Sequence, residues 1–203
     1  DKLAYKSNDP KVKESIGESW EISGVQDNIS VVSEGALEGN SLQELTEIYM
    51  GDLVGDKIYE KFGIEFPLLI KYIDARDNLS IQVHPDDATA KARHNAYGKT
   101  EMWYVLDASR DASLVYGFNQ DMEKEQLRRS IEQGKVEDFL QKVSVHKNDT
   151  FFIEAGTVHA IGAGSLIAEI QENSNLTYRM YDYDRVDKNG KKRPLHIEKA
   201  LDV

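Results

Sequence analysis

The sequence predicts a mainly β protein, a barrel or jelly roll to which helices have been added. Many short segments alternate apolar and polar residues, and Gly, Asn and Asp residues separate them. Alternation with a period of two is typical of strands with one buried face, and those residue types favour the turns between strands. One stretch, at about residues 121–143, instead has apolar residues at helical spacing. We interpret it as a helical insertion of two short helices on one face of a barrel or jelly roll.

The strand pattern recurs along most of the chain. The run PLLIKYID predicts a buried strand in which Lys71 is the only cation. A single lysine in such a strand usually extends its amine to solvent, so Lys71 has a structural interpretation as well as a functional one. The expected strands are residues 18–24, 28–35, 67–74, 79–83, 102–106, 114–118, 150–154, 158–161, 165–171 and 176–183.

Helices are expected where the strand pattern is interrupted. A capping box at residues 41–44, SLQE, pairs side chain and backbone at a helix start and predicts a helix that runs to about Met50. A second short helix is expected over residues 52–62, because Gly63 is placed to end it. His-Pro-Asp-Asp leads into a third helix at residues 88–94, and the chain ends in the helix-like sequence IEKALDV.

Composition and charge exclude several classes of function. The 203 residues suit one domain, which we place at residues 1–203. A net charge of -11 disfavours nucleic acid as a partner, although a few converging Lys and Arg residues can still bind a small phosphorylated ligand. No apolar run is long enough for a membrane span and no secretory signal is visible, so we expect a cytoplasmic protein with no membrane partner. A monomer is compatible with this composition.

The polar residues with the clearest chemistry lie near the middle of the chain. Alternation along a predicted strand places Ser80, Gln82 and His84 on one face, and Lys99 and Glu101 directly precede the next strand. If the two strands pair or neighbour each other, these side chains converge on one pocket. Because the chain has no cysteine, a metal there would need amide, imidazole and carboxylate ligands. A cation beside such ligands suits an anionic substrate.

His159 is a second histidine in a position that suits metal binding. It follows a tight turn at the start of a predicted strand, where a side chain can lie at a barrel mouth. A single histidine is more often a hydrogen-bonded structural residue than a ligand. With Gln82, His84 and Glu101, however, it offers two imidazoles, one carboxylate and one amide oxygen, which suits zinc with an open position. Three further histidines have polar or charged neighbours and are weaker candidates: His94, His146 and His196.

Two charged residues in the last third of the chain have both structural and functional interpretations. Glu169 lies in the apolar strand LIAEI, where a carboxylate needs a partner, and this makes it a site candidate. Arg179 precedes the acidic run YDYDR, which could hold it in a surface salt-bridge network.

Four motifs occur in the chain in the order SIQVHPDD, GKTEMWY, AGTVHA and EIQENSNLTYRMYDYDR. Together they resemble the type I phosphomannose isomerases, and the likeness extends over nearly the whole chain. The resemblance implies a cupin-type jelly-roll barrel that holds one Zn²⁺ per chain. It also implies an enzyme whose substrate is a small phosphorylated sugar. Members of this family interconvert mannose 6-phosphate and fructose 6-phosphate by moving a proton between C1 and C2 through an enediolate.

The resemblance further implies roles for particular residues. The implied zinc ligands are Gln82, His84, Glu101 and His159. Arg179 corresponds to the catalytic arginine of the family, and Ser80 and Lys71 correspond to residues associated with the sugar phosphate. Lys99, Glu169 and a zinc-bound water are alternative bases for the proton transfer.

The chain departs from the family pattern in several places. Asn175 stands where the family often has Asp, so this position carries an amide in place of a carboxylate. Ala155 replaces a proline before the AGTVHA turn. The Trp-Gly-Gly segment and the second C-terminal β-domain of the family are not found in the sequence, which begins at Asp1. We therefore expect a chain that is shortened at both ends.

Two other functions compete with the isomerase. A metal-bearing cupin could bind sugar or sugar phosphate as a sensor, without catalysis, because this fold hosts many functions. Retention of Lys99, Arg179 and Glu169 together favours the enzyme. A cupin oxygenase fits less well, since such sites use two histidines and a carboxylate on iron and have little need of Lys71 or Arg179.

Overall fold

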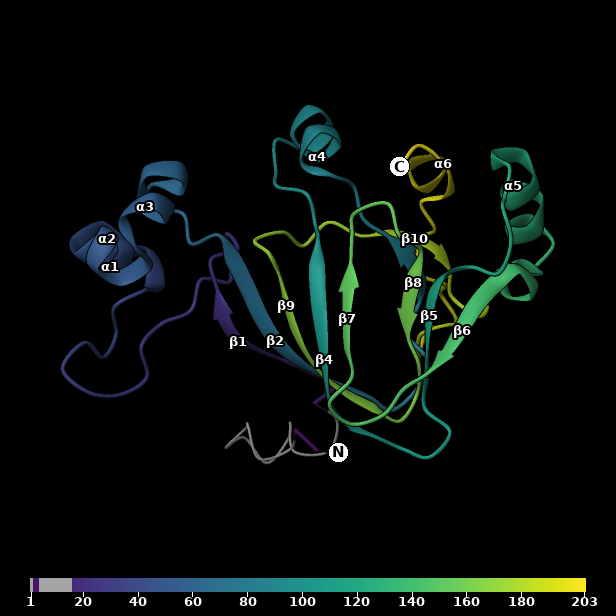
Figure 1. Cartoon of the computed structure of the whole chain (residues 1–203), viewed down its shortest axis with the longest axis horizontal. Helices are drawn as coiled ribbons and strands as arrows, with labels where there is room; N and C mark the ends of the chain where they lie inside the picture. Colours follow the sequence, from purple (N-terminus) through teal and green to yellow (C-terminus); the bar gives the residue numbers. More distant parts are fainter. Residues whose placement is uncertain (1, 4–15) are drawn as a thin grey trace.

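The computed structural model describes residues 2–3 and 16–203, and these residues form two five-stranded antiparallel sheets with added helices. The first sheet has the strand order β1-β2-β9-β4-β7, and the second has the order β10-β3-β8-β5-β6. Figure 1 shows the first sheet to the left of the second, with helices at the left, at the top and at the right. The prediction of a mainly β barrel with added helices is therefore confirmed.

Strands that are far apart in the sequence alternate within each sheet. The first sheet contains β1 (Glu18–Ser23), β2 (Leu68–Ala75), β9 (Ser165–Glu172), β4 (Glu101–Ala108) and β7 (Thr150–Ile153). The second contains β10 (Tyr178–Tyr181), β3 (Ile81–Val83), β8 (His159–Ile161), β5 (Ser113–Phe118) and β6 (Leu140–Ser144). The helices are α1 (Leu42–Tyr49), α2 (Gly51–Val54), α3 (Asp56–Phe62), α4 (Asp87–His94), α5 (Lys124–Glu132), the 3-10 helix η2 (Val136–Phe139) and α6 (Ile197–Leu201).

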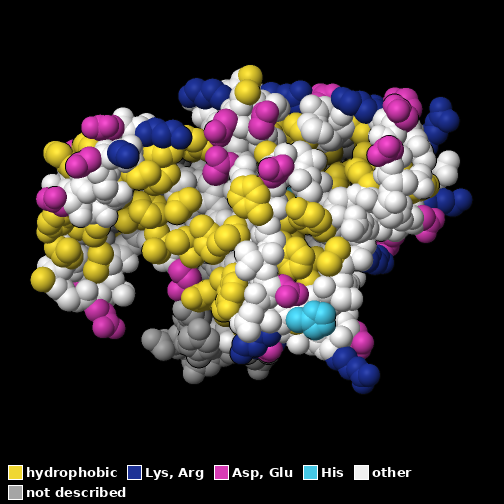
Figure 2. Space-filling view, viewed as in Figure 1, with side chains coloured by type: hydrophobic (Ala, Val, Ile, Leu, Met, Phe, Trp, Pro, Cys, Tyr) yellow, Lys and Arg dark blue, Asp and Glu magenta, His cyan; other side chains and the backbone are white. Residues whose placement is uncertain are grey.

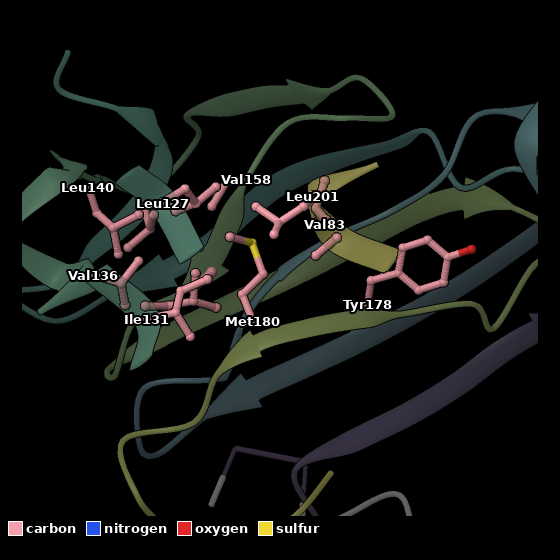
Figure 3. Packing of buried hydrophobic residues seen from close by; sticks show 13 residues of the cluster. Val83, Leu127, Ile131, Val136, Leu140, Val158, Tyr178, Met180 and Leu201 are labelled. Carbon is pink, nitrogen blue, oxygen red and sulfur yellow. The ribbon is translucent and has the colours of Figure 1, made fainter. Parts of the chain in front are cut away.

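Two apolar clusters hold the fold together. One lies between the sheets, where Trp103 and Ile167 of the first sheet pack with Leu114 and Ile161 of the second. The other lies on the outer side of the second sheet, where α5, η2 and α6 cover it. Figure 3 shows Met180 at the centre of this outer cluster, between side chains of the sheet and of the helices. The second sheet therefore has a covered outer face and an inner face that looks into the barrel.

Strand alternation separates the inner from the outer residues of the first sheet. Along β2 and β9 every second residue is buried, as expected for strands with one face in the interior. The inward residues of these strands include polar and charged ones, whereas exposed apolar side chains gather on α1–α3, at the left of Figure 2. The buried polar and charged side chains of these strands therefore lie inside the barrel.

The predicted capping box is confirmed at the start of α1. The Ser41 hydroxyl accepts a hydrogen bond from the Glu44 backbone at 3.2 Å, and the Glu44 carboxylate accepts one from the Ser41 backbone at 2.7 Å. The predicted helix over residues 52–62 is interrupted, because Gly55 adopts a φ of 89° that continues neither α2 nor α3.

Two further predictions about local structure are wrong. Residues 28–35 do not form a strand beside β1, because Val31 pairs with Ser41 in a single bridge and the chain closes a local loop there. The expected second helix of the insertion at about 121–143 is only the 3-10 turn η2, after which β6 begins at Leu140 and pairs with β5. β6 is the last strand of the second sheet, and Leu140 is the only one of its five residues that is buried. Among the described residues, no helix has the length and apolar character that a membrane span requires.

Candidate active site

The two candidate histidines come from neighbouring strands of the second sheet. Gln82 of β3 pairs with His159, the first residue of β8, and His84 lies directly beyond the end of β3. Both imidazoles are buried, with 1% of each residue exposed. Their Nε2 atoms lie 3.1 Å apart.

Glu101 reaches the same point from the opposite sheet. It is the first residue of β4 and is 2% exposed. One carboxylate oxygen lies 3.5 Å from His84 Nε2, and the other lies 3.3 Å from His159 Nε2. The condition that the strands of His84 and Glu101 pair or neighbour each other is not met, because β3 and β4 belong to different sheets. The side chains converge across the barrel interior instead.

The arrangement of these atoms fits a bound divalent cation. Both oxygens of Glu101 are buried, and no hydrogen bond reaches either of them from the described residues. His159 donates from Nδ1 to the Thr157 carbonyl at 2.8 Å, which leaves the Nε2 lone pair free to bind a metal. Ligands at roughly 2.1 Å from a tetrahedral ion lie roughly 3.4 Å from one another, and the separations of 3.1 to 3.5 Å among these three side chains agree with that.

Gln82 lies at the edge of this cluster. Its amide nitrogen is 3.4 Å from His159 Nε2, and its amide oxygen is 3.5 Å from the Ser80 hydroxyl. A half-turn of the amide exchanges its oxygen and nitrogen without moving the side chain, and it would bring the oxygen to the imidazole. The Gln82 amide thus lies beside the three-residue cluster, on the side of His159.

Burial shifts the pKa values of the three central side chains. It lowers the pKa of His159 to about 4, and it holds the pKa of His84 well below its ordinary value, with the charge of Lys99 adding to the effect. Burial also raises the pKa of Glu101 to about 8, and the nearby Glu169 carboxylate contributes to that rise. At neutral pH the metal-free site therefore holds neutral imidazoles and a protonated Glu101.

The pH dependence of metal binding follows from these protonation states. Because Glu101 must lose its proton to bind a cation, apparent metal affinity should rise about tenfold per pH unit up to about pH 8 and level off above it. The histidines add no slope in this range, since they are already neutral. Titration of the metal-free protein with zinc and a competing chelator, between about pH 6 and pH 9, measures the slope. A flat profile would contradict this account of Glu101.

Lys71 and Glu169 form a buried ion pair beside the cluster. They face each other in register on β2 and β9, and Lys71 Nζ lies 3.1 Å from Glu169 Oε1. Trp103 donates from its indole to the other oxygen of Glu169 at 2.9 Å, and Glu18 lies 3.6 Å from Lys71. Burial alone would raise the pKa of Glu169, but the charges of Lys71 and Lys99 outweigh it and lower the pKa. Lys71 therefore does not extend to solvent.

Lys99 is held close to Glu101 by the approach of two loops. Its backbone donates to the Pro85 carbonyl at 3.1 Å. Gly98 permits this approach, because a Cβ at that position would lie 2.6 Å from the backbone nitrogen of Asp87. The buried Lys99 amine lies 3.6 Å from the Glu101 carboxylate. A primary amine therefore borders the candidate metal site.

Arg179 enters the site through β10, which pairs with β3 and places Arg179 opposite Gln82. Its guanidinium donates to the Ser80 hydroxyl at 3.3 Å and to the Pro194 carbonyl at 3.1 Å. Burial lowers the pKa of Arg179, and the positive charge of Arg193 adds to the effect. The salt-bridge alternative for Arg179 is not what the structure shows, because Asp182 of the acidic run binds Arg185 and Arg193 instead.

The remaining histidines lie outside the cluster. His94 contacts the Tyr178 hydroxyl at 2.8 Å, His196 accepts from the Arg179 backbone at 3.1 Å, and His146 is exposed. Asn175 is also exposed.

Sequence reasoning missed Trp103 and Gln171, which both lie on the inner face of the first sheet. Trp103 holds Glu169, as described above, and its ring packs against His159 with centroids 5.3 Å apart. Gln171 is 1% exposed and pairs with Glu101 in register. Strand alternation places Gln171 on the same face as Glu169, and this signal could have identified it.

Comparison with known proteins yields consistent matches. A family model described as phosphomannose isomerase type I, catalytic domain, matches residues 2–110. Mannose-6-phosphate isomerase ManA of Bacillus subtilis is 44% identical over 191 residues, which cover 92% of this chain and 58% of that protein. A solved mannose 6-phosphate isomerase from Bacillus subtilis is 38% identical with a TM-score of 0.81, over 92% of this chain and 58% of that one. A solved mannose 6-phosphate isomerase bound with zinc and yttrium shares the fold at 17% identity, with a TM-score of 0.68, over 98% of this chain and 68% of that one.

Proposed function

The chain belongs to the type I phosphomannose isomerase family, and from this premise we propose that it is a zinc-dependent aldose-ketose isomerase. The substrates would be mannose 6-phosphate and fructose 6-phosphate. The observation that carries the proposal is the convergence of His84, Glu101 and His159 from opposite sheets, with an unsatisfied buried carboxylate at its centre. The chain spans 58% of the length of the ManA relative, so the activity of the whole relative is proposed here for the chain rather than observed.

The residues present fit a zinc ion. His84, Glu101 and His159 would hold it, with Gln82 as the fourth ligand. Bound there, zinc would supply a Lewis acid beside the sugar oxygens on C1 and C2. Its ligand set contains no thiolate and one carboxylate, so the site would keep a net positive charge.

Arg179 and Ser80 would bind and orient the sugar phosphate. The guanidinium stays charged at all relevant pH values and offers a rigid fork of donors, which suits the adjacent oxygens of an enediolate. Two of its donors are fixed by Ser80 and Pro194, so the group is held in place before the substrate arrives. The Lys71 ammonium has three N–H donors and two carboxylate neighbours, so one donor would remain for the substrate.

Proton transfer between C1 and C2 needs a group that can hold the proton inside the barrel. Glu169 has both oxygens engaged, by Lys71 and Trp103, and its lowered pKa makes it a weaker base. Lys99 has a carboxylate at 3.6 Å and no tighter ion pair among the described residues. We therefore favour Lys99 as the residue that moves the proton, with Glu169 setting the charge of its surroundings.

Turnover and proton exchange together test the isomerase. The purified protein, reconstituted with zinc, should convert mannose 6-phosphate to fructose 6-phosphate, and in deuterated water it should exchange the C2 proton of the substrate. Protein stripped of metal by a chelator should do neither until zinc is restored. Binding of sugar phosphate without exchange at C2 would reject the enzyme and support the sensor.

Loss of Lys71 should weaken the fold as well as substrate binding. In Lys71→Met the buried Glu169 carboxylate loses its nearest cation, and breaking such a pair typically costs about 3–5 kcal/mol. Thermal unfolding should show a clear drop in the melting temperature. The double variant Lys71→Met/Glu169→Gln should recover part of it, because no uncompensated charge remains. Equal stability of wild type and Lys71→Met would show that the ion pair is not important to the fold.

A further inference from the structure

Gln171 carries a buried side-chain oxygen that no donor satisfies. The residue lies in β9 and is 1% exposed, and alternation along this strand puts it on the inner face with Glu169. Its Oε1 has no hydrogen-bond partner among the described residues. Buried acceptors are seldom left unpaired, because each forfeits the hydrogen bond that it made to water. Such an oxygen in the interior indicates a group that binds a ligand.

The orientation of this amide is fixed by its other end. Gln171 Nε2 lies 2.9 Å from the Glu172 carbonyl and 2.5 Å from the Ser174 carbonyl. Carbonyl oxygens can only accept, so the atom between them must be the NH₂ group of the amide. A half-turn would place two carbonyls against the amide oxygen, and this excludes the alternative orientation. The amide oxygen therefore remains the unpaired atom.

The register of the first sheet places Gln171 beside the candidate metal centre. Gln171 pairs directly with Glu101 on β4, and such antiparallel neighbours have Cβ atoms roughly 5 Å apart on the same face. On its other side Gln171 pairs with Leu69, which is 1% exposed and offers no donor from its side chain. When a metal is bound, Glu101 has lost its proton and can only accept, so neither of these two neighbours offers a side-chain donor to Gln171 Oε1. A ligand that satisfies this oxygen must then bring its own donor.

We propose that Gln171 binds the substrate by accepting a hydrogen bond from a sugar hydroxyl close to the reacting carbons. This inference rests on the isomerase function proposed above and adds a contact that determines substrate specificity. A hydroxyl suits the position because it can donate to the amide and brings no charge near Glu101. Sites built to bond a hydroxyl discriminate strongly against analogues that lack it, because the protein group is then left unpaired.

A comparison of sugar analogues with variants tests the contact. Wild type, Gln171→Met and Gln171→Glu are assayed with mannose 6-phosphate and with its 3-deoxy and 4-deoxy analogues, and the dissociation constants are measured by calorimetry. Wild type should discriminate against one of the two analogues by roughly 10- to 100-fold. Gln171→Met should lose this discrimination, since it has no acceptor, whereas Gln171→Glu, which keeps an oxygen, should retain it. Gln141→Met, the same change on an exposed strand residue, should behave as wild type.

Several outcomes would overturn the inference. If the wild-type protein binds both deoxy analogues with the same affinity as mannose 6-phosphate, that result alone overturns the inference. If Gln171→Met loses affinity equally for all three sugars and still discriminates between them, Gln171 only holds the Glu172–Ser174 turn. Loss of bound zinc in Gln171→Met would make the residue a metal ligand instead. Because binding and turnover are measured separately, discrimination in binding without turnover would reject the isomerase and still support the contact.

Discussion

Replacing His84 with alanine is expected to remove the metal and the isomerase activity together. The imidazole is buried within 3.5 Å of the other two side chains of the cluster, so no surface residue can take its place. Loss of one oxyanion donor alone costs roughly 100- to 1,000-fold in rate, and loss of a whole Lewis acid should lower kcat/KM by at least about that factor. Metal content by elemental analysis and turnover of mannose 6-phosphate are the two measurements.

A matched histidine outside the cluster controls for the substitution itself. The His146 side chain is 81% exposed, so His146→Ala should keep both metal and activity. Far-UV circular dichroism should show the same fold for both variants. If His84→Ala retains one equivalent of zinc and full turnover, the three-residue cluster is not the metal site, and the proposed function loses its main support.

The sequence predicted most of the strands, but it could not predict which strands pair with each other. The apolar runs predicted β2 and β9 as strands, but the buried alternate residues of these strands include Lys71 and Glu169, which an apolar pattern does not mark as interior. Their pairing brings Lys71 next to Glu169, which is almost a hundred residues away in the sequence. No pattern within a few neighbouring residues predicts that register. For the same reason β3 and β4, which follow each other in the sequence, end in opposite sheets.

The candidate ligands could be identified by residue type and by their position next to turns. His84 lies just beyond the end of β3 and His159 is the first residue of β8, whereas Gln82 is the middle residue of the three-residue β3. Gln171 escaped notice because an amide in a strand is chemically ordinary. Only its register with Glu101 and its unpaired oxygen make it unusual, and both are tertiary facts.

Among the helices, too, a local signal was predicted correctly and an effect of tertiary pairing was not. The capping box at Ser41 is a local signal that needs only four residues, and it was confirmed. The stretch at about 121–143 divided into α5, a 3-10 turn and a strand, because its C-terminal part gains more from pairing with β5 than from a second helix. Tertiary pairing outweighed local periodicity there.

Changing Arg179 to lysine is expected to slow catalysis strongly while leaving the metal bound. Lysine keeps the positive charge but lacks the planar fork, so it cannot donate to Ser80, to Pro194 and to the substrate in one fixed geometry. Loss of a preorganised donor at developing negative charge should lower kcat by roughly 100- to 1,000-fold. Steady-state kinetics with mannose 6-phosphate should place most of this loss in kcat rather than in KM.

The division between kcat and KM separates a catalytic arginine from one that only recruits the phosphate. If Arg179 bound the phosphate equally in ground state and transition state, Arg179→Lys would raise KM and leave kcat unchanged. Arg110→Lys, at an exposed position, is the matched control and should change neither constant. Unchanged zinc content in Arg179→Lys would locate the defect in the chemical step, because among the described residues Arg179 reaches the cluster through Ser80 and Gln82. A kcat close to that of wild type would assign the stabilisation of the enediolate to other residues.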